Sequence, residues 1–167
     1  MRRVVVTGIG LLTPIGSGKD EFWSALIAGK CGIAPVTSFD TSTFPVHKGA
    51  AMLVLESLGA ARARGAKICA EVLGYGVSCD SHHMVAAHPQ GDGAMRAMAA
   101  AMRESGVSLQ DIDYISAHGT GTPANDRMES IAVRRLFGKY ADRIPMSSIK
   151  SMLGHTMGPQ DAAGLPT

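Results

Sequence analysis

The chain has 167 residues, of which 46% are hydrophobic and 18% are charged, so it can form a packed core and intrinsic disorder is excluded. Its net charge of +2 predicts no strong attraction to nucleic acid or to a membrane surface, and no apolar run approaches the roughly 20 residues of a membrane span. Its three cysteines are an odd number without framework spacing, which favours a reducing compartment, and we expect a cytoplasmic protein.

The beginning of the chain predicts two strands, a helix and a long loop. A β-branched run over Arg3–Thr7 predicts a strand that ends at a glycine turn, Gly8-Ile9-Gly10. Glu21–Ala28 is expected to form a short helix, and Cys31–His47, with its prolines, glycines and hydroxyl residues, a loop. Met52–Leu55 is continuously apolar, which predicts a strand buried on both faces.

The middle of the chain predicts a strand followed by a longer helix. Ile68–Val77 is a strand candidate whose end is weakened by two glycines. Three methionines and an alanine within Asp92–Glu104 recur at i, i+3, i+4 and i+7, which predicts an amphipathic helix. We expect Asp92 to be its N-cap and Gly106 its C-cap.

Two more strands and a helix are expected in the last third of the chain. Tyr114–Ala117 and Ile144–Ile149 have strand character. Between them, Asp126 and Glu129 have the spacing of a capping box, which predicts a helix that ends at Gly138. Alternating strands and helices predict an α/β layered fold with a largely parallel sheet.

Two weak motifs have ordinary structural interpretations. Gly8-Ile9-Gly10 follows a strand, as in a dinucleotide-binding fingerprint, but the third glycine is missing, and a structural turn is favoured. Cys79, His82, His83 and His88 contain metal-ligand side chains, but no second pair has matching spacing. This segment is therefore interpreted as a polar loop without a metal.

Two stronger motifs follow strand candidates. In His118-Gly119-Thr120-Gly121-Thr122-Pro123, a strand leads a histidine into a loop whose glycines let a substrate approach the backbone and whose threonines offer hydroxyl groups. In Ser148-Ile149-Lys150-Ser151-Met152-Leu153-Gly154-His155, a strand leads to Lys150, and a Gly-His pair follows. The order and separation of the two motifs make them more specific together than separately.

With these residues the sequence resembles the β-ketoacyl-acyl carrier protein synthases, the condensing enzymes of fatty-acid and polyketide synthesis. HGTGTPAND and IKSMLGH are similar to the two histidine loops of that family. The opening RRVVVTGIGLLTPIG and the segments GAAMLVLES and ARARGAKICAEVLGYG are similar to its N-terminus and its middle. The resemblance covers nearly all of the chain.

The resemblance implies an incomplete thiolase-like α/β fold. Residues 1–58 would be a remnant of the N-terminal half, and residues 59–167 a truncated C-terminal half that keeps most of its early part. We expect two sheets, one with Arg3–Thr7 and Met52–Leu55, and a second with Ile68–Val77, Tyr114–Ala117 and Ile144–Ile149.

The resemblance also implies roles for five residues. His118 and His155 would donate hydrogen bonds to the enolate oxygen formed when malonyl-carrier protein loses CO₂, and Lys150 would orient His118. Thr120 and Thr122 would bind the pantetheine arm of the carrier. The implied partners are acyl carrier protein and malonyl and acyl thioesters; no cofactor is expected, because phosphopantetheine arrives on the carrier. Intact family members dimerise.

The cysteine nucleophile of the family has no counterpart in this sequence. In family members it lies between the two stretches that here meet near His47, and Cys31, Cys69 and Cys79 do not match it. We therefore expect no acyl transfer or condensation by this chain alone. Two alternatives stay open: a non-catalytic module that binds carrier protein or pairs with an intact subunit, and an unrelated nucleotide-binding α/β protein.

Overall fold

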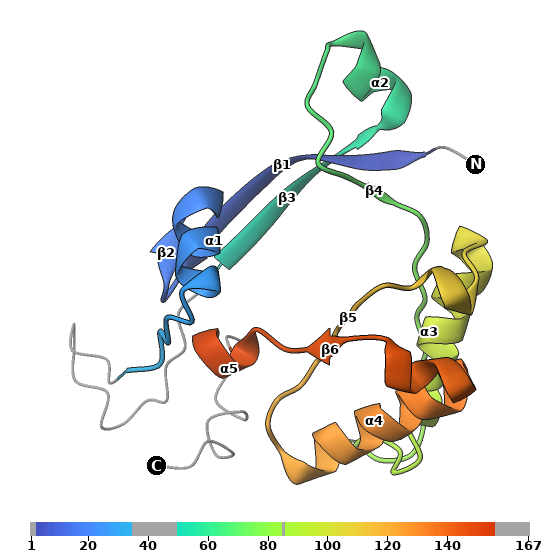
Figure 1. The fold of residues 1–167 in the computed structure, drawn as a ribbon. Coiled ribbons are helices and arrows are strands. Elements are labelled where there is room, and N and C mark those ends of the chain that lie inside the picture. Colours follow the sequence, from blue (N-terminus) through green and yellow to red (C-terminus); the bar gives the residue numbers. More distant parts are fainter. Residues whose placement is uncertain (1–2, 35–49, 85, 156–167) are drawn as a thin grey trace. The chain divides into compact units, whose positions relative to one another are not determined.

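A computed structural model describes residues 3–34, 50–84 and 86–155 (Figure 1). The chain divides into two compact units, the first containing the residues up to Val72 and those from Ile149, and the second containing Leu73–Ser148. The two units are defined by contacts within the chain. The assignment of residues 1–58 and 59–167 to the two halves of a longer protein therefore stays a prediction. Residues 35–47 of the predicted Cys31–His47 loop lie outside the described residues.

The first unit is built on an antiparallel sheet around its first strand. Its strands are β1 (Val4–Thr13), β2 (Gly16–Ser17), β3 (Ala50–Ser57) and β4 (Ala70–Val72), and each of the others pairs with β1 (Figure 1). The expectation that the first and second predicted strands share a sheet is confirmed. The parallel arrangement is wrong for this sheet, and so is the placement of the third predicted strand in the second sheet, because β4 pairs with β1.

The glycine turn expected after Thr7 is also wrong, because β1 continues through it. The pairing with β3 shifts register between Val6 and Gly8, as in a β-bulge, and Gly8 then lies opposite Val54. The chain turns only after Thr13, whose hydroxyl donates a hydrogen bond to the carbonyl of Gly16 at 2.8 Å. A dinucleotide fingerprint needs its glycines in a strand-to-helix turn, so the nucleotide interpretation loses its basis.

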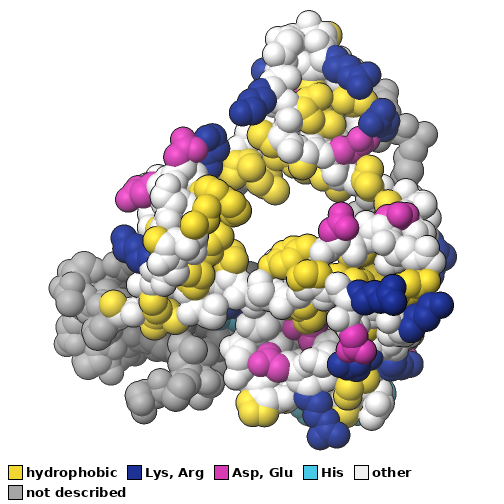
Figure 2. Space-filling model, in the orientation of Figure 1, with side chains coloured by type: hydrophobic (Ala, Val, Ile, Leu, Met, Phe, Trp, Pro, Cys, Tyr) yellow, Lys and Arg dark blue, Asp and Glu magenta, His cyan; other side chains and the backbone are white. Residues whose placement is uncertain are grey.

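The strand β3 is exposed, which corrects the prediction that it is buried on both faces. Met52 is 74% exposed and Leu53, Val54 and Leu55 are each more than half exposed. Within the described residues of the first unit β3 pairs only with β1, and no second layer covers its middle. Figure 2 shows hydrophobic side chains at the surface over this sheet and the neighbouring helix.

Short helices complete the first unit. The helix predicted over Glu21–Ala28 is confirmed as α1 (Lys19–Ile27), which packs beside β1 and β2. The helix α2 (Leu58–Ala63) follows β3 directly. Its N-cap is Ser57, whose hydroxyl accepts a hydrogen bond from the amide of Ala60. The last element is α5 (Lys150–Leu153).

The second unit packs two longer helices beside a pair of parallel strands. The helices are α3 (Asp92–Ser105) and α4 (Pro123–Phe137), and the strands are β5 (Ile115–Ser116) and β6 (Met146–Ser147). The pairing of the strands predicted over Tyr114–Ala117 and Ile144–Ile149 is confirmed, and it is parallel. Two 3₁₀ helices, η1 (Leu109–Asp111) and η2 (Gly138–Arg143), precede the strands.

The predicted start of α3 is wrong by one residue, whereas its end is confirmed. Gly91 is the N-cap, in the left-handed conformation, and its Cα approaches the backbone of α4 so closely that a Cβ would lie 2.7 Å from the carbonyl oxygen of Met128. The carboxylate of Asp92 instead pairs with Arg135 of α4 at 2.7 Å. Gly106 closes the helix with φ 69°, a conformation that glycine adopts without strain.

The segment after β4 runs along α3 at close range. It was expected to continue the strand to Val77, but the strand ends at Val72. The backbone amide of Tyr75 donates a hydrogen bond to the carboxylate of Glu104 at 3.0 Å. A Cβ built on Gly76 would lie 1.9 Å from the carbonyl oxygen of Ala97, so this contact requires glycine.

No helix among the described residues is long and apolar enough to cross a membrane. This finding concerns only the helices given above.

A carboxylate at the end of β3 predicts acid sensitivity of the first unit. Hydrogen bonds, first from Arg64 and then from Thr7, lower the pKa of Glu56 from 4.5 to about 2. Because the folded-state pKa is lowered, Glu56 stabilises the fold fully above about pH 4.5 and loses this contribution as the pH falls toward about 2. We expect Glu56→Gln to be less stable than the unsubstituted chain at pH 7, with a difference that shrinks through this window in urea denaturation. A difference independent of pH would contradict this assignment.

Candidate functional site

The His118 loop connects β5 to α4, and hydrogen bonds hold its start and its centre. At its start, the amide of Ala117 donates to the carbonyl of Ser147 at 2.9 Å, which extends the β5–β6 pairing. At its centre, the amides of His118 and Gly119 donate to the two oxygens of the Glu129 carboxylate, at 2.7 and 2.9 Å. A carboxylate that accepts two successive backbone amides fixes the conformation of the residue that precedes the glycine.

Glu129 holds the His118 loop, whereas the sequence predicted a different role for it, in a capping box. The helix α4 begins at Pro123, a favourable first residue, so the predicted capping box at Asp126 is wrong. Glu129 consequently lies in the second turn, where its side chain reaches back to the loop and also accepts a hydrogen bond from Asn125 at 3.4 Å. The i, i+4 spacing of Asn125 and Glu129 was the available signal for this polar face.

Gly119 is required by both the backbone conformation and the space around it. Its φ is +44°, and a Cβ at this position would lie 2.5 Å from the Cβ of Ser148. The hydroxyl of Ser148 also donates a hydrogen bond to the carbonyl of His118 at 3.3 Å. Hydrogen bonds to Glu129 of α4 and from Ser148 therefore hold the loop backbone on both sides. The imidazole of His118 extends from this backbone.

The two threonines form a hydroxyl pair at the tip of the loop. Their Oγ1 atoms are 2.9 Å apart, and the amide of Thr122 also points to Thr120 Oγ1 at 3.4 Å. Thr122 is the N-cap residue of α4, but its side chain makes no capping hydrogen bond. Both side chains are half-buried, and Gly121 between them has φ +79° with open space on its Cβ side. The Cβ side of Gly121 is thus open beside two hydroxyl groups.

Lys150 and His155 lie at the two ends of α5 in the first unit. Lys150 is the first residue of this helix rather than the end of a strand, because β6 stops at Ser147. The amide of Gly154 closes the helix on the carbonyl of Lys150 at 2.8 Å, and His155 follows. The predictions that His155 approaches His118, and that Lys150 lies near His118, stay predictions, because His118 belongs to the other unit.

The loop that contains Cys79 and three histidines is organised by a carboxylate. Asp80 accepts the amides of His88 and Gly93 at 3.0 and 2.7 Å, and these hydrogen bonds, the one from His88 first, lower its pKa. The rings of His82 and His88 meet edge to face, with centroids 4.9 Å apart. Among the described residues, no group of three or more His, Cys, Asp or Glu is placed to hold a metal ion.

We expect Glu129→Ala to release the His118 loop. The substitution removes the acceptor of two backbone amides, and a hydrogen bond to a charged group contributes about 2 kcal/mol, less at the exposed amide of His118. Hydrogen exchange should therefore accelerate at the amides of His118 and Gly119. Glu129→Gln keeps an acceptor oxygen and should have a smaller effect, and Arg127→Ala, an exposed neighbour on α4, should have none. Unchanged exchange in Glu129→Ala would show that the loop does not depend on this carboxylate.

The part of the chain that contains the His118 loop matches a known protein family. Residues 69–166 match the family described as beta-ketoacyl synthase, C-terminal domain. This match covers more than half of the chain. The chain belongs to the β-ketoacyl synthase family.

Relatives of this β-ketoacyl synthase chain include both curated proteins and solved structures. It is 47% identical to 3-oxoacyl-[acyl-carrier-protein] synthase 2 of Staphylococcus aureus over 115 residues, which cover 69% of this chain and 28% of the relative. A structure of a type II polyketide acyl-carrier protein in complex with its ketosynthase aligns with a TM-score of 0.63 and 32% identity, over 81% of this chain and 36% of that one. The chain thus spans less than a third of the length of the curated relative.

A third comparison concerns the fold alone. The ishigamide ketosynthase/chain length factor aligns with a TM-score of 0.83 over 94% of this chain and 82% of that one, at 24% identity. The expected partial thiolase-like α/β fold is confirmed. The antiparallel first sheet and the parallel β5–β6 pair are therefore parts of this fold.

Proposed function

We propose that this chain carries the enolate-stabilising part of a 3-oxoacyl-carrier protein synthase. The reaction is the decarboxylative Claisen condensation of malonyl-carrier protein with an acyl thioester, in fatty-acid or polyketide synthesis. The observation that carries the proposal is the His118 loop, in which Glu129 binds two successive amides and two threonine hydroxyls flank a glycine. The 47% identity to a 3-oxoacyl-[acyl-carrier-protein] synthase supports it.

In the proposed mechanism, His118 and His155 donate to one oxygen. The C–C bond to the malonyl carboxylate breaks and CO₂ leaves. The electron pair of that bond stays on the thioester, which becomes an enolate. Two imidazole N–H groups donate to the enolate oxygen without requiring a full positive charge. The enolate carbon then attacks the acyl thioester carbonyl, and the thiolate that held the acyl group leaves. Lys150 is a positioning residue that orients His118.

The threonine pair is proposed to bind the pantetheine arm of an acyl carrier protein. Pantetheine contains two amide groups, which can exchange hydrogen bonds with Thr120 and Thr122 at the half-buried loop tip. The related ketosynthase in complex with its acyl-carrier protein supports this class of partner. No cofactor of the chain's own is proposed, since the phosphopantetheine belongs to the carrier. Dimerisation and a cytoplasmic location are proposed on the resemblance and on cysteine usage.

In the family, a cysteine nucleophile forms the acyl-enzyme. On the resemblance, this sequence has no counterpart of that cysteine. Cys31, Cys69 and Cys79 are free and exposed. On the resemblance, none of them corresponds to the family's nucleophile. Incubated with radiolabelled acyl-carrier protein, the chain alone is expected to form no covalent acyl-protein band. Such a band would show that one of these cysteines is a nucleophile after all.

A chimera tests the proposed function directly. Residues 69–155 of this chain replace the aligned segment of the Staphylococcus aureus synthase, which supplies the remaining part of the enzyme. We expect the chimera to form 3-oxoacyl product from malonyl- and acyl-carrier protein. A folded chimera that takes up the acyl group but releases no product would contradict the assignment, because acylation would be intact and the segment from this chain would have failed.

A further inference from the structure

The second unit has a hollow at the end of β5 opposite to the His118 loop. It has a volume of about 480 Å³ and is lined by η1, η2 and the residues that lead into the two strands. The residues that line it are Leu109, Gln110, Ile112, Asp113, Tyr140, Arg143 and Ile144. The size lies within the range of roughly 300–1,000 Å³ that small-molecule sites have. Since Asp113 precedes β5 and His118 follows it, the hollow is separate from the candidate catalytic loop.

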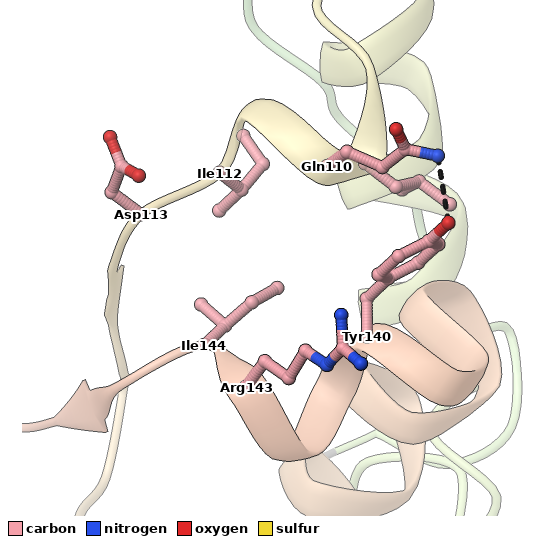
Figure 3. A pocket seen from close by; sticks show the side chains of 7 residues that line it. Gln110, Ile112, Asp113, Tyr140, Arg143 and Ile144 are labelled. Carbon is pink, nitrogen blue, oxygen red and sulfur yellow. Dashed lines mark hydrogen bonds between the residues drawn. The ribbon is translucent and has the colours of Figure 1, made fainter.

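The lining of the hollow is mixed: three aliphatic side chains stand among polar ones, and the polar groups contribute the larger share of its surface. Figure 3 shows Ile112 and Ile144 pointing toward one another across the hollow, from the segments before β5 and β6. On the other side, Gln110 Nε2 donates a hydrogen bond to the hydroxyl of Tyr140 at 2.7 Å, which joins η1 to η2 and fixes the tyrosine (Figure 3). A mixed lining of this kind suits a ligand that has both a hydrocarbon segment and a polar end.

The charge that faces the hollow is positive. Arg143 lies at its edge beside Tyr140, whereas the carboxylate of Asp113 points away from it (Figure 3). The other nearby carboxylates are engaged elsewhere: Asp111 accepts from the amide and hydroxyl of Ser108, and Asp142 pairs with Arg134 at 2.8 Å. A second cation, Lys139, lies 5.2 Å from the centre of the Tyr140 ring.

We infer that this hollow binds an aliphatic carboxylate. The hydrocarbon chain packs between Ile112 and Ile144, and the carboxylate accepts hydrogen bonds from the guanidinium of Arg143. Guanidinium groups match carboxylates in geometry and can bind both oxygens at once. The site differs from the His118 loop in location and in the ligand that it takes, so its test is independent of the proposed condensation activity.

Octanoate is a suitable probe, and octanol is its matched neutral analogue. In titrations of the full chain followed by two-dimensional ¹H–¹⁵N NMR, octanoate should shift the amides of Ile112, Tyr140 and Ile144 and leave the His118 loop unchanged. Octanol, which keeps the hydrocarbon body, should bind about tenfold more weakly, since it lacks the charged group. Equal affinities for the two probes, or no saturable binding of octanoate, would overturn the inference.

A pair of arginine variants locates the carboxylate. Arg143→Gln should weaken octanoate binding by about tenfold and leave octanol binding unchanged. Arg103→Gln removes an exposed arginine from the last turn of α3 and serves as the matched control, with no expected effect. Circular dichroism verifies that both variants fold. An equal loss of octanoate affinity in the two variants would mean that octanoate responds only to net charge, and the site would be rejected. If a variant fails to fold, the comparison of octanoate with octanol in the unsubstituted chain still tests the inference.

Discussion

In the chimera with the Staphylococcus aureus synthase, His118→Ala is expected to lower kcat for condensation by about 10²–10³-fold. The reason is the loss of a positioned N–H donor to the enolate oxygen, an effect of this size at oxyanion-binding sites. Hydrogen bonds to Glu129 and from Ser148 already hold the backbone around His118, so only its side chain has to be ordered for the reaction. The measurement is steady-state formation of 3-oxoacyl product at saturating malonyl-carrier protein.

The double variant tests whether the two histidines share one oxygen. His155→Ala should lower kcat by a factor similar to that of His118→Ala. The double variant should lower kcat by far less than the product of the two factors, because the effects of groups that act as a unit are not additive. Losses that multiply would mean that the histidines act independently, against the proposed geometry. Lys139→Ala, an exposed residue of η2, is the control and should leave the rate unchanged.

Gly76→Ala is expected to have the largest effect on stability, a loss of about 3 kcal/mol in the free energy of unfolding. The new Cβ would lie 1.9 Å from the carbonyl oxygen of Ala97 and 2.8 Å from the amide nitrogen of Ala101, both in the backbone of α3. A helix backbone cannot yield as the end of a flexible side chain does, so the extended segment must move away from α3 and lose its packing. Urea denaturation followed by circular dichroism measures the loss.

A second glycine provides the contrast. Gly59 lies within α2, and a Cβ built on it meets nothing within 4 Å. Gly59→Ala should therefore be neutral or stabilising by up to about 1 kcal/mol, because alanine favours helices. If Gly76→Ala unfolds at the same urea concentration as the unsubstituted chain, the close approach of this segment to α3 is not part of the folded protein.

The elements that the sequence predicted best are those whose signals are local. The methionine period and Gly106 predicted α3, and the helix over Glu21–Ala28 was found within two residues at its start. The His118 and Lys150–His155 motifs were also readable, because each is a contiguous run. Local hydrogen bonds and side-chain spacing within a few residues contain enough information for such features.

Tertiary structure decided the features that depend on partners far along the chain. The apolar run of β3 is compatible with a central buried strand, but among the described residues no second layer covers the sheet that it forms with β1, so its side chains are exposed. Gly8 lies within a strand instead of a turn, because it pairs with Val54 of β3 after the register shift. Glu129 has the spacing of a capping residue, yet the helix begins at Pro123, which frees the carboxylate to bind the amides of His118 and Gly119. Long-range pairing selects among locally equivalent patterns, and no short stretch of sequence contains that choice.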